Sequence, residues 1–201
     1  MGTKTLKRTL RQQINRVEKW YSLADDETIQ AGKVWYSNAH NWAEDVAASF
    51  TGGECEATIS VYKVATITAI LSAQCDWDTN KANVIKFIAN PRDPQGMFAT
   101  QKQLDECRAV ISEGWTIPEH RRKTYTFATT IANPDIDHCA VIDRHAIKVA
   151  FDQTSSAPIC ITDKRYSDAE KAFIVAADRH NLLASQVQAI TWCAYKQHTG
   201  R

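Results

Sequence analysis

Four short segments of the chain bring charged, amide and aromatic side chains together in a pattern that suits a site for a polar substrate. One of them places Asp143 two residues before His145. A carboxylate and an imidazole are side chains that enzymes use to transfer protons and to stabilise developing positive charge. The other segments hold tryptophan and tyrosine rings beside amide and charged side chains. The segments are 35–40, 71–80, 141–145 and 186–192.

The elements that must position these segments are helices. Apolar residues recur at helical spacing along most of the chain, and Asp143 is a good N-cap for the helix that follows it. Residues 57–74 are rich in Thr, Val and Ile, but a run of about 18 residues without a turn signal is too long for a typical strand. We therefore expect an all-α fold of about nine helices. They lie near 4–22, 31–50, 57–74, 78–89, 100–112, 118–132 and 143–151, with two more opening at the capping boxes of Ser167 and Ser185.

The composition excludes several classes of protein. The 201 residues are 44% hydrophobic and 23% charged, which is typical of globular chains, and 24 Lys+Arg against 23 Asp+Glu leave a net charge of +1. No apolar run approaches the roughly 20 residues of a membrane helix, and no secretory signal follows the basic N-terminus. The six cysteines are widely scattered, so we expect a cytoplasmic protein without a metal site or a cofactor.

Residues 1–22 are expected to form a basic amphipathic helix. Residues 1–19 hold six Lys or Arg and a single acidic residue. Two interpretations stay open, since such a helix could face DNA as an arm or could simply have a solvated outer face.

The four segments lie within a longer series of motifs that resembles the endonuclease III type of helix–hairpin–helix DNA glycosylases. That family has a helix ending in Leu-Ser-Ala-Gln, then an Asn-Lys-Ala stretch, an Ile…Gly…Lys-Ala segment, a Val-Asp-Thr-His element, a capped helix and a Trp-containing helix. The order of these motifs is kept over most of this chain, and a colinear set is more specific than any one motif. The similar stretches are 71–74, 80–82, 111–124, 141–149, 167–178 and 185–196.

The resemblance implies a single two-lobed helical domain over residues 1–201, with Asp143 and His145 as its catalytic residues. In the family, the aspartate lies beside the sugar of a flipped-out nucleotide, where it stabilises positive charge or orients water. By the same resemblance, Gln74 is the wedge that fills the gap left by the base. The rest of the predicted DNA- and base-binding set is Trp77, Asn80, Trp35, Tyr36, His40, Lys123, Arg121, Arg122, Arg144, Gln188 and Trp192.

The sequence also departs from the family. No glycine lies between Gly114 and Gly200, whereas the family's DNA-binding hairpin needs glycines to approach phosphate closely. The hairpin is therefore deleted, together with the lysine nucleophile that follows it in bifunctional members. The four-cysteine cluster is missing as well. Without an amine nucleophile, no strand-cutting lyase step is expected.

Three functions are compatible with these features. The first is a minimal monofunctional glycosylase acting on a flipped, modified or unmodified base of DNA. The second is a transferase of bacteriophage thymine hypermodification. In that reaction an amine replaces pyrophosphate on an activated nucleobase, and Asp143 accepts a proton from the incoming amine. The third is a non-catalytic module that binds DNA or a host protein. Residues 35–40 and 143–146 also resemble a group of bacteriophage proteins, which would place the protein in the host cytoplasm.

Each candidate residue also has a purely structural interpretation. The role of a helix N-cap, which contributes about 1 kcal/mol to stability, would by itself explain why an aspartate stands at position 143. Gln74 and Asn80 could cap helix ends, and Trp35 and Trp192 could be core residues. The cations at 121–123 could form a solvated helix face.

Overall fold

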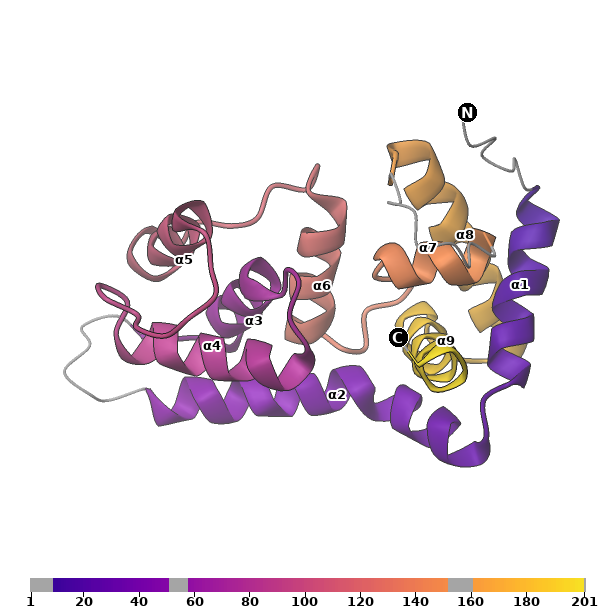
Figure 1. Cartoon of the computed structure of the whole chain (residues 1–201), viewed down its shortest axis with the longest axis horizontal. Coiled ribbons are helices and arrows are strands. Elements are labelled where there is room, and N and C mark those ends of the chain that lie inside the picture. Colours follow the sequence, from indigo (N-terminus) through magenta and orange to yellow (C-terminus); the bar gives the residue numbers. More distant parts are fainter. Residues whose placement is uncertain (1–8, 51–57, 152–160, 201) are drawn as a thin grey trace. The chain divides into compact units, whose positions relative to one another are not determined.

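The computed structural model describes residues 9–50, 58–151 and 161–200, and these ranges form nine α-helices and no strand (Figure 1). The predicted all-α class and number of helices are confirmed. The helices are α1 (Leu10–Ser22), α2 (Asp26–Ser49), α3 (Val61–Leu71), α4 (Trp77–Ala89), α5 (Gln101–Glu113), α6 (Arg122–Ala132), α7 (Arg144–Phe151), α8 (Asp163–His180) and α9 (Ala184–Thr199).

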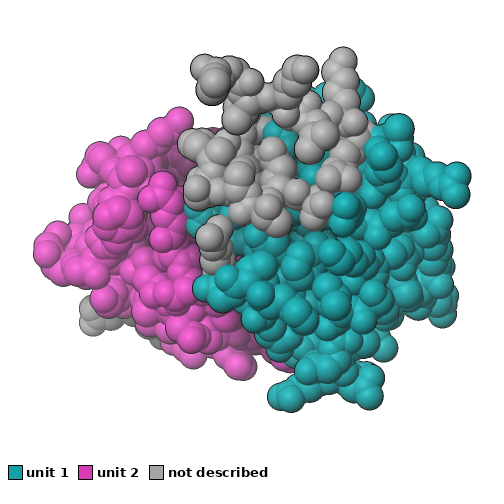
Figure 2. Space-filling model, turned by 45° about the vertical axis from the view of Figure 1, so that its right-hand side comes forward, with its two compact units in different colours: residues 1–36, 135–201 teal, residues 37–134 magenta. Residues whose placement is uncertain are grey.

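The chain divides into two compact units, drawn in different colours in Figure 2. Unit 1 comprises Met1–Tyr36 and Asp135–Arg201, and unit 2 comprises Ser37–Pro134. The helix α2 contributes its N-terminal residues to unit 1 and the remainder to unit 2. No helix in the described part of the chain is long and apolar enough to cross a membrane.

In unit 1, α1 packs against α7, α8 and α9, and those three helices also pack against one another (Figure 1). The face of α1 that carries Ile14, Val17 and Trp20 is buried, while Arg11 and Lys19 are exposed. The described part of the N-terminal helix thus belongs to the core of its unit and has a solvated basic face. Its predicted start at residue 4 lies outside the described residues, and so does most of the loop that the sequence predicts at 153–163.

In unit 2, α3 is the central helix and packs against α4, α5 and α6. Every residue from Val64 to Leu71 is buried, as the apolar run of the sequence predicts for a helix surrounded by others. The helix ends three residues before the predicted position because the chain turns sharply at Gln74, whose φ of 62° lies in the left-handed region. That conformation is uncommon for a residue with a β-carbon.

Within unit 1, the first part of α2 crosses α9 at very short range. A β-carbon added to Gly32 would lie 2.4 Å from the side chain of Ile190 and 2.6 Å from its Cα atom. A hydrogen bond stabilises the crossing: the Gln186 side-chain amide donates to the Lys33 carbonyl at 3.1 Å. Glycine is therefore required at position 32, because only its missing side chain lets the two backbones approach this closely.

The start of α6 differs from the prediction. A helix beginning at Pro118 was expected, but the helix begins at Arg122. The backbone N–H of Arg121 instead donates to the Pro118 carbonyl at 2.9 Å and closes a turn ahead of the helix.

Two predicted capping boxes are also wrong. The N-cap of α8 is Thr162 rather than Ser167, since its hydroxyl accepts the N–H of Arg165 and places Ser167 inside the helix. The helix α9 begins after Leu183, whose N–H donates to the Gln186 side chain at 3.0 Å, and Ser185 is buried in the first turn. In both cases a different neighbour caps the helix.

Candidate active site

Asp143 lies at the start of α7, where the buried residues Ala140 to Ile142 anchor the chain in unit 1. Its Oδ1 atom accepts hydrogen bonds from the backbone N–H groups of His145 and Ala146, each at 2.8 Å. These bonds make Asp143 the N-cap, which confirms the predicted capping role. One carboxylate oxygen is thereby held in a fixed position at the positive end of the helix.

The second oxygen of the same carboxylate faces an imidazole. Asp143 Oδ2 lies 3.2 Å from His145 Nδ1, so the two side chains form a pair across the first turn of α7. With a proton on Nδ1, the ring donates to the carboxylate and the Nε2 atom carries the free lone pair. No partner of Nε2 is found among the described residues. The side chains of Asp143 and His145 are 26% and 17% exposed, so neither is enclosed in the core.

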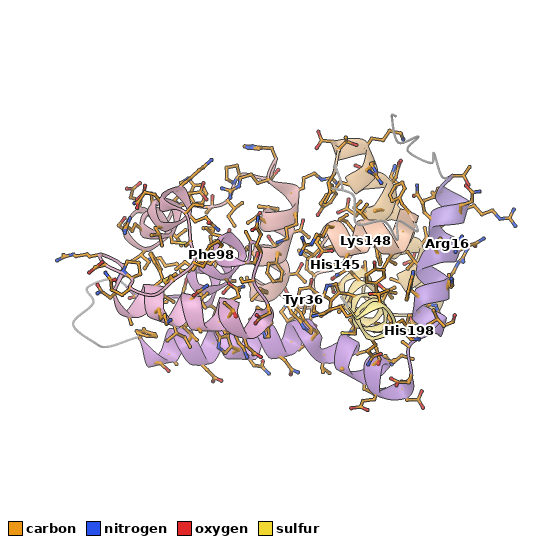
Figure 3. All side chains as sticks on the ribbon, viewed as in Figure 1. Arg16, Tyr36, Phe98, His145, Lys148 and His198 are labelled. Carbon is orange, nitrogen blue, oxygen red and sulfur yellow. The ribbon has the colours of Figure 1, made fainter. Side chains whose placement is uncertain are left out.

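A phenol and an amide from two other helices of unit 1 form a buried hydrogen bond in the neighbourhood of this pair. The Tyr36 hydroxyl, on α2, donates to Gln188 Oε1, on α9, at 3.0 Å. Both residues are buried, at 5% and 7% exposure. Burial raises the pKa of Tyr36 well above its ordinary value, and the negative charge of Asp143 raises it further. The phenol therefore stays protonated at neutral pH and acts as a hydrogen-bond donor. Tyr36 and His145 are both labelled in Figure 3.

Aromatic rings complete the surroundings of the imidazole. The edges of Trp192 and Tyr195, both on α9, meet His145 at centroid distances of 6.4 and 6.1 Å. Lys196 lies 4.4 Å above the Trp192 ring, and Trp35 contacts Tyr36 edge-on at 4.7 Å. Trp35 and Trp192 are both half-buried, so part of each ring is available at the surface.

The Asp143 carboxylate and the His145 imidazole together suit two kinds of chemistry. A fixed carboxylate stabilises a cation that forms next to it, and an imidazole oriented by that carboxylate accepts a proton from water or an amine. Among the described residues, no group of three or more His, Cys, Asp or Glu side chains could hold a metal ion.

Two residues of unit 2 in the predicted DNA-binding set form hydrogen bonds within the protein instead. Asn80 is only 2% exposed, and its amide donates to the Thr68 carbonyl at 3.1 Å, so it is a core residue rather than a contact for a base. His40 Nδ1 lies 2.8 Å from the Ile131 carbonyl. The burial of Asn80 follows from its position on the face of α4 that packs on α3.

The basic residues of unit 2 in the predicted DNA-binding set also interact within the protein. Arg121 pairs with Glu106 at 2.8 Å, and the Lys123 ammonium donates to the Ser72 hydroxyl at 3.0 Å. Arg122 is half-buried at the start of α6. Sequence alone could not distinguish these paired cations from a free basic patch.

Gln74 and Trp77 keep access to solvent in unit 2. Gln74 is exposed at the turn after α3, and Trp77 is half-buried with its ring edge-on to Trp42 at 5.5 Å. Their predicted roles as wedge and stacking platform stay predictions.

The predicted role of Tyr36 requires a correction. A ring that is 5% exposed has no free face for a base, so Tyr36 supports the site through its hydroxyl rather than by stacking. Gly32 was missed, because a helix predicted from residue 31 puts this glycine in its first turn, whereas the structure places it inside α2 and against Ile190.

The comparisons with known proteins place the chain in a family. The chain belongs to the family described as "Family of unknown function (DUF7178)", which it matches over residues 2–199. No curated protein and no solved structure matches the chain.

Proposed function

We propose that this protein is a minimal monofunctional DNA glycosylase, with Asp143 and His145 as the catalytic residues. The observation that carries the proposal is the pairing of the Asp143 carboxylate, which is 26% exposed and fixed at a helix N-terminus, with His145 Nδ1 at 3.2 Å. The resemblance of segments 71–82 and 141–149 to glycosylases supports the same assignment.

In this reaction, the bond between the base nitrogen and the sugar C1′ breaks, and its electron pair leaves with the base. The Asp143 carboxylate lies beside the sugar and stabilises the positive charge that develops there. A water molecule attacks C1′ and gives its proton to His145 Nε2. The departing base takes up a proton from solvent, so the products are the free base and an abasic site.

The test uses the conservative substitution Asp143→Asn. Asparagine caps helices about as well as aspartate does, so this variant removes the negative charge and keeps the cap. DNA from bacteriophages with different modified bases is incubated with the wild type or the variant, and alkali-labile sites are counted. We expect sites with the wild type on at least one DNA and a loss of at least about a hundredfold in the variant.

The matched control is Asp76→Asn, which changes another N-cap aspartate, at the start of α4 in unit 2. It is expected to keep the wild-type rate. Equal rates for wild type and Asp143→Asn would refute the catalytic assignment. A product that appears only with an added amine and an activated base would identify the transferase instead, and DNA binding without any product would identify the binding module.

A further inference from the structure

We infer that Gln188 selects the base on which the site acts, by donating a hydrogen bond from its amide nitrogen to a carbonyl oxygen of that base. The preferred bases would then carry an oxo group at the position where the disfavoured ones carry an amino group. This inference rests on the proposed function for its class of ligand, a flipped-out nucleobase.

The orientation of the Gln188 amide is set by Tyr36. The Tyr36 hydroxyl donates to Gln188 Oε1 at 3.0 Å, and the buried phenol stays protonated, so the amide oxygen is held on the side of the phenol. The amide nitrogen is then turned away from Tyr36. It has no hydrogen-bond partner among the described residues, and it is not one of the fully enclosed unpaired atoms.

Such a donor is unusual in a side chain that is more than nine-tenths buried. Buried polar groups are nearly always paired, because a buried donor or acceptor without a hydrogen bond loses its hydration and gains nothing in exchange. A fixed, unpaired and partly accessible donor is therefore a good candidate for a contact with a ligand.

The position of Gln188 connects this donor with the catalytic pair. Gln188 and Trp192 are four residues apart on α9 and therefore lie on the same face of the helix. Trp192 meets the His145 ring at 6.4 Å, and α7 packs against α9. Gln188 thus lies on the face of α9 that is turned toward the start of α7, one turn of helix before the residue that meets His145, and its partner Tyr36 is close enough to Asp143 to feel the carboxylate charge.

A donor in this place distinguishes two classes of base. Uracil and hypoxanthine present a carbonyl oxygen where cytosine and adenine present an amino group. The carbonyl accepts the Gln188 hydrogen bond, whereas an amino group would bring two donors together and leave both unpaired. A site built around a hydrogen bond rejects ligands that cannot make it.

The test measures binding, not catalysis. Single-stranded oligonucleotides made of abasic tetrahydrofuran residues carry one variable nucleotide: deoxyuridine, deoxycytidine, deoxyinosine or deoxyadenosine. Their affinities for the full-length protein are compared by fluorescence anisotropy. We expect the wild type to bind each oxo nucleotide at least about fivefold more tightly than its amino counterpart.

Two variants of Gln188 sharpen the result. Gln188→Glu replaces the donor by an acceptor and is expected to reverse the preference toward the amino nucleotides. Gln188→Met keeps the length of the side chain without hydrogen bonding and is expected to remove the preference. The matched control is Gln197→Glu on the same helix, where Gln197 accepts the Thr28 hydroxyl at 2.9 Å, and it should keep the wild-type ratio.

Equal wild-type affinities within both pairs, no binding of any oligonucleotide, or an unchanged ratio in Gln188→Glu would each overturn the inference. A ratio that follows the prediction in a protein that never produces abasic sites would retain the base-reading role and refute the glycosylase. If the protein forms abasic sites but binds oxo and amino nucleotides equally, the glycosylase is retained and the base-reading role of Gln188 is refuted.

Discussion

The two oxygens of Asp143 have different tasks. Oδ1 caps α7 through two backbone N–H groups, and Oδ2 faces His145. These tasks can be separated by substitution, because asparagine keeps a capping oxygen and alanine does not. We predict that Asp143→Ala lowers the free energy of unfolding by about 1 kcal/mol, whereas Asp143→Asn changes it by only a few tenths. Urea denaturation measures both values, and an equal loss in the two variants would contradict this division.

The buried phenol of Tyr36 leads to a prediction at alkaline pH. Its pKa in the folded protein is raised, mainly by burial and then by the charge of Asp143. A raised pKa means that the stabilising effect of the protonated phenol is complete below the unfolded pKa of about 10 and declines as the pH rises above it. At neutral pH, Tyr36→Phe should lower the free energy of unfolding by about 1 kcal/mol, because Gln188 loses its donor.

Above about pH 10, the difference between wild type and Tyr36→Phe should narrow, because only the wild type gains a proton-releasing phenol at position 36 when it unfolds. Chemical denaturation at pH 8 and at pH 11 tests this. The exposed Tyr62 provides the control, since Tyr62→Phe removes a phenol that is 41% exposed and should shift the two measurements little. A constant Tyr36→Phe difference across this range would show that the buried phenol ionises as freely as an unfolded one.

At the scale of elements, the crossing of α2 and α9 decides where the site residues meet. Gly32 lies one turn before Tyr36, and Ile190 lies two residues after Gln188. An added methyl group at position 32 would overlap the backbone of Ile190 and push the helices apart. We predict that Gly32→Ala destabilises the protein by about 1–3 kcal/mol, despite the higher helix propensity of alanine. Thermal or urea denaturation measures the effect.

The control for this crossing is Gly114→Ala. Gly114 ends α5 in the left-handed conformation with nothing within 4 Å of an added β-carbon, so its substitution strains the backbone but creates no clash. Gly32→Ala should also weaken the contact between Tyr36 and Gln188, whereas Gly114→Ala should not. A Gly32→Ala protein as stable as the wild type would show that the two helices can separate without cost.

The sequence predicts helices well where their signals are local. The capping box of Thr100 and the cap of Asp143 depend on residues within three positions, and both are present. It fails where two local signals compete, as at α8, where the Thr162 hydroxyl displaces the box of Ser167. The partners of Asn80, Arg121 and Gln188 are distant in the chain, so no spacing rule could show that Asn80 is buried or that Gln188 binds Tyr36.

At the scale of the whole molecule, the net charge of +1 conceals an uneven distribution. Unit 1 contains 15 Lys+Arg and 12 Asp+Glu, whereas unit 2 contains 9 and 11. The unit that holds Asp143 and His145 is therefore the basic one. Because phosphate attraction supplies much of the affinity for DNA, unit 1 is the part expected to hold the backbone of a nucleic acid.

Arg144 and Arg121 test this charge distribution. Arg144 is exposed beside Asp143 and has no ion-pair partner among the described residues, whereas Arg121 is paired with Glu106 at 2.8 Å. A free cation that contacts phosphate releases a counterion, so Arg144→Gln should weaken DNA binding and reduce the slope of log affinity against log salt by about one. Arg121→Gln, which removes the same charge, should leave the slope unchanged, because its guanidinium is already neutralised by a carboxylate. Anisotropy titrations with one oligonucleotide at several salt concentrations measure both slopes, and a larger change in Arg121→Gln than in Arg144→Gln would move the phosphate contacts to unit 2.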